Sequence, residues 1–243
     1  MSRERKSRSS KKKNQELKRQ QEEVKVDNTK YDYKSIELKS PNQVTYYNSI
    51  MKNHITFCTG FAGAGKSYIA IAAAIDLIKR YPHLYTKVVV VRPYIMTSSE
   101  RIGAIPGSLS EKILPFAMAI KDNLSLLMCD KAVEQFLERI EFCVLSTIRG
   151  RSFNNAIILA EESQNIPIKS GCFKTLMTRI GTPGKLIISG DVTQSDIPIE
   201  ECALTDAINR FKGMDGVGIC EMSDYSDIQR NPLIAEILKR YVE

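Results

Sequence analysis

The fold is decided by the stretch Ile55-Thr-Phe-Cys-Thr-Gly60-Phe-Ala-Gly63-Ala-Gly65-Lys66-Ser67. Its first five residues predict a short buried strand, the glycines predict a loop with unusual backbone angles, and residues 67–80 predict a helix. A strand, the pattern Gly-x-x-x-x-Gly-Lys-Ser and a helix, in this order, are typical of a phosphate-binding P-loop. Backbone N–H groups and the positive end of the helix dipole would surround the phosphates. The alternative is a glycine-rich turn that binds nothing.

The P-loop pattern also predicts what its side chains do. Lys66 would reach the β and γ phosphates of a nucleotide, and the Ser67 hydroxyl would bind the magnesium ion that bridges them. The expected nucleotide contacts are consecutive in the chain: Gly60, Phe61, Ala62, Gly63, Ala64, Gly65, Lys66, Ser67 and Tyr68.

Charge is distributed unevenly along the 243 residues. Residues 1–19 contain nine Lys or Arg and two Glu, a surplus of seven that equals the whole formal net charge of +7. Residues 1–30 have almost no apolar side chains and predict a disordered basic tail, while residues 31–243 predict a single domain. Such a tail either contacts the phosphates of a nucleic acid or only aids solubility.

The cysteines and histidines exclude several kinds of site. The six cysteines form no C-x-x-C pair and lie mostly in apolar runs, which favours reduced thiols in a cytoplasmic protein over disulfides or a zinc site. With His54 and His83 as the two histidines, a histidine-based metal or catalytic cluster is not expected. The sequence shows no signal peptide and no apolar run long enough to cross a bilayer, so we expect no membrane partner.

Hydrophobic patterning predicts strands that alternate with helices. This is typical of an α/β fold with a mostly parallel sheet and helices on both faces. The expected strands cover residues 55–59, 87–91, 141–146, 156–160, 185–189 and 217–220. The expected helices cover residues 44–51, 67–80, 108–139 with a break near Asp130, 169–180, 201–211 and 232–241. A long loop over residues 94–108 is expected to be functional or mobile.

Candidate site residues follow four of the expected strands. Gly60, Arg92, Glu161 and Asp191 each come directly after one of them. Because ligands of parallel sheets bind at the carboxyl ends of the strands, we expect these four residues at one edge of the sheet.

Hydrolysis of a nucleotide needs carboxylates beside the P-loop. Glu161 and Glu162 follow a buried strand, so Glu161 would hold a metal-bound water and Glu162 the attacking water. Asp191 and Gln194 would meet the γ-phosphate and its water. A surface acidic pair and a capped turn are the alternative interpretations of these two segments.

Seven segments together resemble the PhoH-like family of P-loop ATPases. They occur in the family's order between about Asn42 and Tyr241: Gly60–Ser67, Arg92-Pro93, Gly103-x-x-Pro106-Gly107, Arg149-Gly-Arg151-Ser-Phe-Asn154, Glu161-Glu-Ser-Gln164-Asn165, Thr178-Arg-Ile-Gly181 and Gly190-Asp-Val-Thr-Gln194-Ser-Asp196. The family is related to superfamily one helicases. The resemblance therefore implies a RecA-like fold and hydrolysis of ATP with Mg²⁺, with RNA as the usual suspected partner.

The resemblance adds two site residues and points to one departure. Gln43 matches the glutamine that reads the adenine edge, and Arg230 matches an arginine expected near the γ-phosphate. The family's metal-proximal Asp is Glu161 here, one methylene longer, which is expected to move the magnesium shell and slow turnover. We expect one RecA-like lobe, which must find its second set of contacts on a neighbouring subunit, and therefore predict a homo-oligomer such as a hexameric ring.

Three functional hypotheses follow. The leading one is an ATPase that acts on RNA or single-stranded DNA as a helicase-like or remodelling enzyme, with Arg92, Arg149, Arg151 and the basic tail as nucleic-acid contacts. A phosphate sensor and a local ion pair are alternative roles for Arg149 and Arg151. The second hypothesis is an ATP-gated RNA-binding switch with negligible hydrolysis, and the third is a small-molecule kinase. A GTPase is disfavoured because the sequence contains no Asn-Lys-x-Asp motif.

Overall fold

The computed structural model describes residues 33–93, 109–229, 231 and 233–242. The chain divides into two units, Met1–Tyr31 and Asp32–Glu243, and the second contains all described residues. The predicted basic tail, the 94–108 loop and Arg230 lie outside the described residues.

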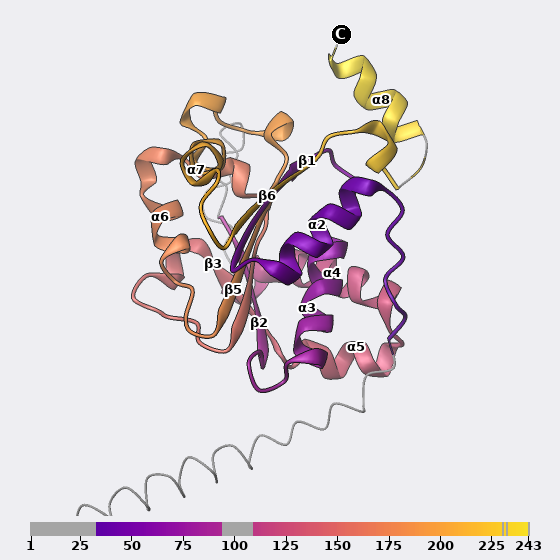
Figure 1. Ribbon diagram of the computed structural model, residues 1–243, viewed down its shortest axis with the longest axis vertical. Helices are drawn as coiled ribbons and strands as arrows, with labels where there is room; N and C mark the ends of the chain where they lie inside the picture. Colours follow the sequence, from indigo (N-terminus) through magenta and orange to yellow (C-terminus); the bar gives the residue numbers. More distant parts are fainter. Residues whose placement is uncertain (1–32, 94–108, 230, 232, 243) are drawn as a thin grey trace, which may run out of the picture. The chain divides into compact units, whose positions relative to one another are not determined.

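Within the described residues, six strands form one parallel sheet in the order β3-β2-β4-β5-β1-β6 (Figure 1). The predicted α/β fold with its parallel sheet is thereby confirmed. The strands β2, β4, β5 and β1 are neighbours, so their carboxyl ends meet at one edge. The strands are β1 (Ile55–Gly60), β2 (Lys87–Arg92), β3 (Ile140–Val144), β4 (Ala156–Ala160), β5 (Gly184–Gly190) and β6 (Val217–Met222).

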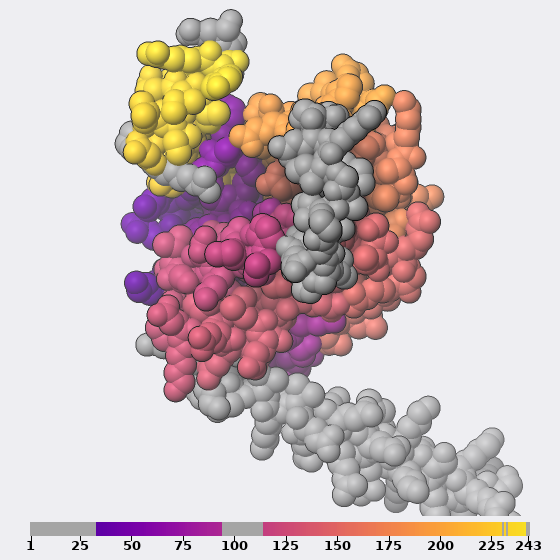
Figure 2. Space-filling view, turned by 180° about the vertical axis from the view of Figure 1, so that it is seen from behind, coloured from indigo at the N-terminus to yellow at the C-terminus, as the bar shows by residue number. Residues whose placement is uncertain are grey.

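Helices cover both faces of the sheet, as predicted. One face carries α2 (Pro41–Lys52), α3 (Lys66–Arg80), α4 (Leu109–Leu127) and α5 (Asp130–Leu137), and the other carries α6 (Cys172–Met177) and α7 (Ala203–Phe211) (Figure 1). Seen from behind, α4 and α5 form the pink surface of the first face (Figure 2). The last helix, α8 (Leu233–Val242), follows β6 and the short 3₁₀ turn η7 (Tyr225–Asp227).

Strand β4 lies in the middle of the sheet and is buried on both faces. Ala156, Ile158 and Ala160 belong to the core that includes Phe173 of α6 and Leu204 of α7. The alternate residues of β4 point to the opposite face, toward α3, and the whole strand is buried. A strand buried on both faces must read as a continuous apolar run, which made it recognisable in the sequence.

Helix α2 is fixed at both ends. Ser40 caps its start by accepting a hydrogen bond from Gln43 N, and Pro41 occupies the first turn. At its end the buried Lys185 Nζ of β5 donates hydrogen bonds to the carbonyl oxygens of Ile50, Met51 and Asn53. Burial lowers the pKa of Lys185 to about 8. These contacts attach α2 to the sheet beside the P-loop strand.

Two predicted elements were wrong in extent. The helix expected over 169–180 is divided into η4 (Ile168–Ser170) and α6, because Gly171 between them has a φ of 65° in the left-handed region. The strand expected over 141–146 ends at Val144, and Leu145–Ile148 form the 3₁₀ turn η2. Within the described residues, no helix is both long and apolar enough to cross a membrane.

Candidate functional site

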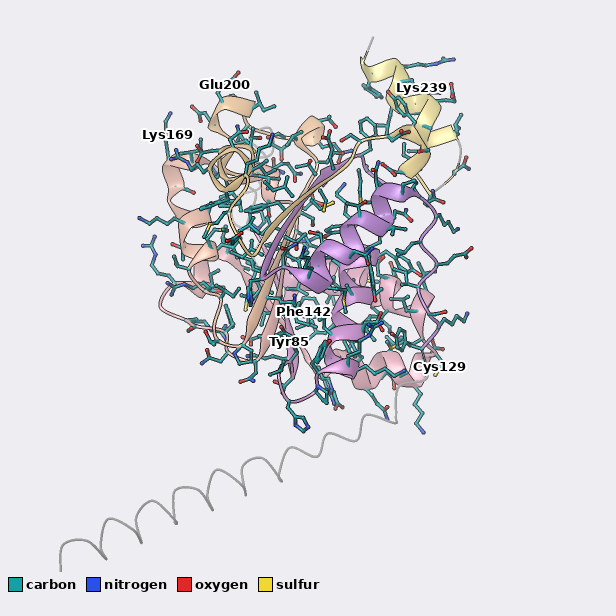
Figure 3. All side chains as sticks on the ribbon, in the orientation of Figure 1. Tyr85, Cys129, Phe142, Lys169, Glu200 and Lys239 are labelled. Carbon is teal, nitrogen blue, oxygen red and sulfur yellow. The ribbon has the colours of Figure 1, made fainter. Side chains whose placement is uncertain are left out.

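A cavity of about 780 Å³ opens at the carboxyl edge of the sheet. Figure 3 shows Tyr85, two residues before β2, at the lower end of the sheet, and Lys239 of α8 at the upper right of the molecule. The cavity is lined from the P-loop side by Ala62, Gly63, Gly65, Lys66, Ser67 and Tyr68, and from the opposite side by Arg92, Glu161, Glu162, Asp191 and Gln194.

The P-loop backbone is shaped by its glycines. Gly60 has a φ of 151°, and a Cβ there would lie 2.2 Å from Met222 O, so no other residue fits beside β6. Gly65 has a φ of 91° and stands at the start of α3 without a capping side chain. The first turn of α3 therefore faces the cavity with backbone N–H groups that a phosphate can use.

Lys66 lies across the loop. Its Nζ donates hydrogen bonds to Gly60 O at 2.6 Å and Phe61 O at 2.8 Å. The side chain also lines the cavity, where an incoming phosphate could replace these two carbonyl groups as its partner.

The segment after β6 supports the P-loop from outside. Phe61 N donates to Met222 O, and Gln229 N donates to Gly63 O, each at 3.1 Å. The Phe61 ring stacks on Tyr225 with a centroid separation of 5.2 Å, and Lys239 Nζ lies 5.3 Å from the Tyr225 centroid. Two backbone hydrogen bonds and a ring pair thus fix the loop before any ligand is bound.

Gln43 lines the cavity but uses its amide group inside the protein. Its Nε2 donates to Ala64 O at 3.1 Å, and its Oε1 accepts from Lys39 N at 2.8 Å. Nearby Asp227 is fully buried and accepts hydrogen bonds from Ser40 Oγ and Asn42 Nδ2. Gln43 therefore joins α2 to the P-loop, and reading a base would require these hydrogen bonds to be exchanged.

Glu161 is paired with an arginine. Its Oε2 accepts hydrogen bonds from Arg92 Nε at 3.1 Å and Arg92 Nη2 at 2.8 Å. The Glu161 side chain is 5% exposed and the Arg92 side chain 19% exposed. The Arg92 guanidinium also lies 4.9 Å from the centre of the Phe116 ring of α4.

Glu162 has an unusual backbone conformation. Its φ of 53° places it in the left-handed region, which a residue with a side chain adopts at a cost of about 1 kcal/mol or more. Its carboxylate accepts a hydrogen bond from Gln164 Nε2 at 2.8 Å. The carboxylate of Glu162 lines the cavity beside Glu161.

Asp191 has one carboxylate oxygen without a partner. Its Oδ1 accepts hydrogen bonds from Thr193 N and Thr193 Oγ1, whereas its Oδ2 is buried and makes no hydrogen bond. A buried carboxylate oxygen with no donor calls for a ligand or an ordered water.

The oxygen groups of the cavity fit a magnesium ion held jointly with a nucleotide. Ser67, Glu161 and Asp191 all line it, and hydroxyl and carboxylate oxygens are the ligands that Mg²⁺ prefers. The described residues contain no group of three or more His, Cys, Asp or Glu able to hold a metal by themselves. Mg²⁺ commonly binds one or two protein ligands together with phosphates and water.

Of the three arginines predicted to contact nucleic acid, one lines the cavity and two lie outside it. Arg92 lies in the cavity. Arg151 lies outside it, where its guanidinium pairs with Glu141 near the start of β3 and covers the Phe153 ring at 4.6 Å. Arg149 is exposed and does not line the cavity. Of the alternatives open from the sequence for Arg151, the local ion pair is the one observed.

Several cavity residues were not predicted. Glu37, Lys39 and Gln229 line the nucleotide side of the P-loop, and Asp122, Asn123 and Leu126 approach from α4. No motif marks them, because their positions depend on how α4 and the segment after β6 pack. Burial, and secondarily Glu37, raise the pKa of Tyr68.

Comparisons with known proteins find relatives across most of the chain. The sequence model of the family described as PhoH-like protein matches residues 35–242. A PhoH-like protein of Bacillus subtilis is 34% identical over 211 residues, which cover 86% of this chain and 64% of that protein. A PhoH-like protein of Mycobacterium leprae is 33% identical over 213 residues, covering 86% and 59%. The chain thus spans about three fifths of these relatives' length.

Among solved structures, the N-terminal domain of the DNA packaging ATPase from bacteriophage phi29 superposes with a TM-score of 0.44 and 14% identity. The superposition covers 76% of this chain and 96% of that domain. A likeness this distant carries no argument about function.

Proposed function

The chain belongs to the PhoH-like family, and we propose that it is a magnesium-dependent ATPase that binds and hydrolyses ATP in the cavity at the carboxyl edge of its RecA-like P-loop fold. We further propose that hydrolysis serves a helicase-like or remodelling action on RNA or single-stranded DNA. One observation carries the first proposal: a single cavity joins the P-loop residues Lys66 and Ser67 to the carboxylates of Glu161, Glu162 and Asp191.

In this proposal each residue has a separate task. The P-loop N–H groups and Lys66 bind the β and γ phosphates, and Ser67 and Glu161 hold the magnesium ion, Glu161 through a water. Bound magnesium neutralises the phosphate charge. Glu162 orients the attacking water and accepts its proton. Three further side chains act at the γ-phosphate: Asp191, Gln194 and, outside the described residues, Arg230.

The nucleic-acid contacts are proposed to lie outside the cavity. Arg149 is exposed and follows the η2 turn, and the basic tail carries the whole surplus charge. Arg151 is available only in part, because Glu141 holds it. Arg92, also predicted as a nucleic-acid contact, is better explained as part of the nucleotide cavity, since its guanidinium is bound to Glu161.

We also propose that the protein forms a homo-oligomer such as a hexameric ring. It is supported by α8, which exposes three apolar side chains spaced four residues apart: Leu233, Ile237 and Tyr241. An exposed apolar stripe on one helix face suits a contact between subunits. A strictly monomeric mass in solution with ATP and Mg²⁺ present, measured by light scattering, would contradict it.

We also propose the domain division and the cytoplasmic location that the sequence predicts. Residues 31–243 would form one ATPase domain and residues 1–30 a basic tail. The six cysteines are free, and this supports a reducing compartment such as the cytoplasm.

An ATP-gated RNA-binding switch is the second candidate, and a specific contact favours it. Arg92 occupies the Glu161 carboxylate that magnesium would need, so turnover could be suppressed. Negligible phosphate release from ATP, with or without nucleic acid, together with ATP-dependent RNA binding, would support this candidate over the first.

The proposed function is tested by magnesium-dependent phosphate release from ATP, with and without single-stranded RNA. We expect release that RNA stimulates and that Lys66→Ala abolishes. Lys212→Ala, which removes an exposed lysine just after α7, is the matched control and should behave like the wild type. Release that survives Lys66→Ala would place hydrolysis elsewhere and contradict the proposal.

A further inference from the structure

Arg92 and Glu161 meet because their strands are neighbours. Val91 of β2 stands opposite Ala160 of β4, and Glu161 N donates a hydrogen bond to Val91 O at 3.0 Å. The two backbones are therefore fixed one residue beyond the end of β4. The side chains of Arg92 and Glu161 are joined by charge-assisted hydrogen bonds. Other charged groups that enter the cavity can replace these bonds.

Burial makes this pair necessary in the ligand-free protein. A carboxylate that is 5% exposed must have its charge balanced, and Arg92 balances it with two hydrogen bonds, from Nε and Nη2. A magnesium-bound nucleotide would bring a cation to Glu161 and phosphate anions to Arg92. Each partner would then find a new counter-charge within the same cavity, so the pair can separate without leaving a buried charge uncompensated.

Phe116 gives the released arginine a fixed place. The guanidinium lies 4.9 Å from the centre of this ring, and an arginine keeps a favourable contact with an aromatic face while its hydrogen-bond donors change partners. Arg92 can therefore turn toward a phosphate without losing its contact with α4.

We propose that Arg92 is a positioning residue that latches Glu161 in the resting protein and releases it when a magnesium-bound nucleoside triphosphate enters. Arg92 thereby sets the concentration of magnesium that the site needs. This inference rests on the proposed function, because it assumes that the cavity binds a nucleotide with Mg²⁺.

The test is a magnesium titration of nucleotide binding at constant pH, read from a fluorescent, non-hydrolysable ATP analogue at saturating concentration. In Arg92→Gln, the magnesium concentration at half-maximal signal should fall about tenfold, since a hydrogen bond to a charged group is worth about that factor. In the same variant, binding of the analogue without magnesium should weaken, because a phosphate contact is lost. Arg210→Gln, which breaks an exposed ion pair with Asp206 on α7, should leave both quantities unchanged.

A second comparison shows whether the effect passes through Glu161. In a Glu161→Gln background, Arg92→Gln should no longer move the magnesium midpoint. Arg92→Lys keeps the charge but not the two-donor fork, so it should lower the midpoint about two- to threefold. It also serves as the test if Arg92→Gln does not fold.

The outcomes separate this inference from the function on which it rests. A wild type that binds the analogue with magnesium, beside a folded Arg92 variant whose midpoint is unmoved or higher, would overturn the latch and leave the proposed function intact. A midpoint that shifts equally in the Glu161→Gln background would also overturn the latch. A wild type that shows no magnesium-dependent binding would overturn both.

Discussion

The two halves of the cavity are built in different ways. The P-loop half is held by main-chain contacts, with Phe61 N on Met222 O and Gln229 N on Gly63 O. The carboxylate half is held by side chains, above all the Arg92 pair to Glu161. Main-chain contacts fix a shape, whereas side-chain ion pairs can be exchanged. We infer that the P-loop half is already formed before a nucleotide binds. The carboxylate half is completed only when the nucleotide and magnesium bind.

The comparison predicts that substitutions in the P-loop half reduce the stability of the fold. The largest effect is expected for Gly60→Ala, because the new Cβ would meet Met222 O at 2.2 Å at a φ of 151°. Clash and backbone strain together should lower the free energy of unfolding by about 3–4 kcal/mol. Urea denaturation followed by circular dichroism measures this change.

Gly213→Ala is the control for Gly60→Ala. Gly213 also has a positive φ, of 80°, but a Cβ there meets nothing within 4 Å. Strain alone should cost about 1 kcal/mol. Equal losses in the two variants would mean that the close approach of β6 does not hold the P-loop.

Substitutions in the carboxylate half should reduce activity and not stability. Glu161→Gln keeps the size of the side chain but removes the charge that magnesium and Arg92 share. Phosphate release should fall about a hundredfold, or about 2.7 kcal/mol in the activation free energy. The free energy of unfolding should change by no more than about 1 kcal/mol. A large loss of stability with unchanged turnover would show that the carboxylate half supports the fold and not the activity.

Lys185 gives a pH-dependent test of how α2 is attached to the sheet. Burial lowers its pKa from 10.5 to about 8, so between these values the unfolded chain binds the proton and the folded protein does not. Stability contributed through Lys185 should therefore rise as pH increases from about 8 to 10.5, by about 2–3 kcal/mol over that window.

The measurement for Lys185 is urea denaturation of the wild type and of Lys185→Met at several pH values. The variant should be less stable near pH 8, because the carbonyl groups of Ile50, Met51 and Asn53 lose their donor, and it should lack the wild-type rise. Parallel pH profiles for the two proteins would show that Lys185 is not the titrating group.

The smallest effect is expected at the outer support of the P-loop. Tyr225→Leu removes the ring that stacks on Phe61 and lies near Lys239. ATP affinity should weaken about three- to fivefold, in line with about 1 kcal/mol for an aromatic pair. Tyr81→Leu, which changes a half-exposed ring at the end of α3, should not alter ATP binding measured by calorimetry. No change in Tyr225→Leu would assign the support to the backbone contacts alone.

The strands and the P-loop could be predicted because they depend on local patterns. Buried runs such as Ala156–Ala160 are apolar on both faces, and glycine is required where the chain passes Met222. The helix predicted over 169–180 is too long, because the left-handed conformation of Gly171 interrupts it. The sequence pattern around Gly171 does not reveal this conformation. Single glycines inside an apolar pattern do not reveal the sign of φ.

The ion pair between Arg92 and Glu161 could not be predicted in the same way. The two residues are far apart in the sequence and meet only because β2 lies beside β4, an order that periodicity does not determine. The hydrogen bonds of Gln43 depend likewise on how α2 packs against the P-loop. The types of residue in the sequence were enough to locate the site. The hydrogen-bond partners of these residues could be identified only once the order of the strands was known.

The central claim, that one cavity binds ATP together with magnesium, is tested most directly by calorimetric titration of the wild type and of Lys66→Ala with ATP, in magnesium and in EDTA. We predict saturable, equimolar ATP binding that magnesium strengthens and that Lys66→Ala removes. Circular dichroism should show that both proteins are folded. ATP binding that is unaffected by Lys66→Ala, or equally strong without magnesium, would contradict it.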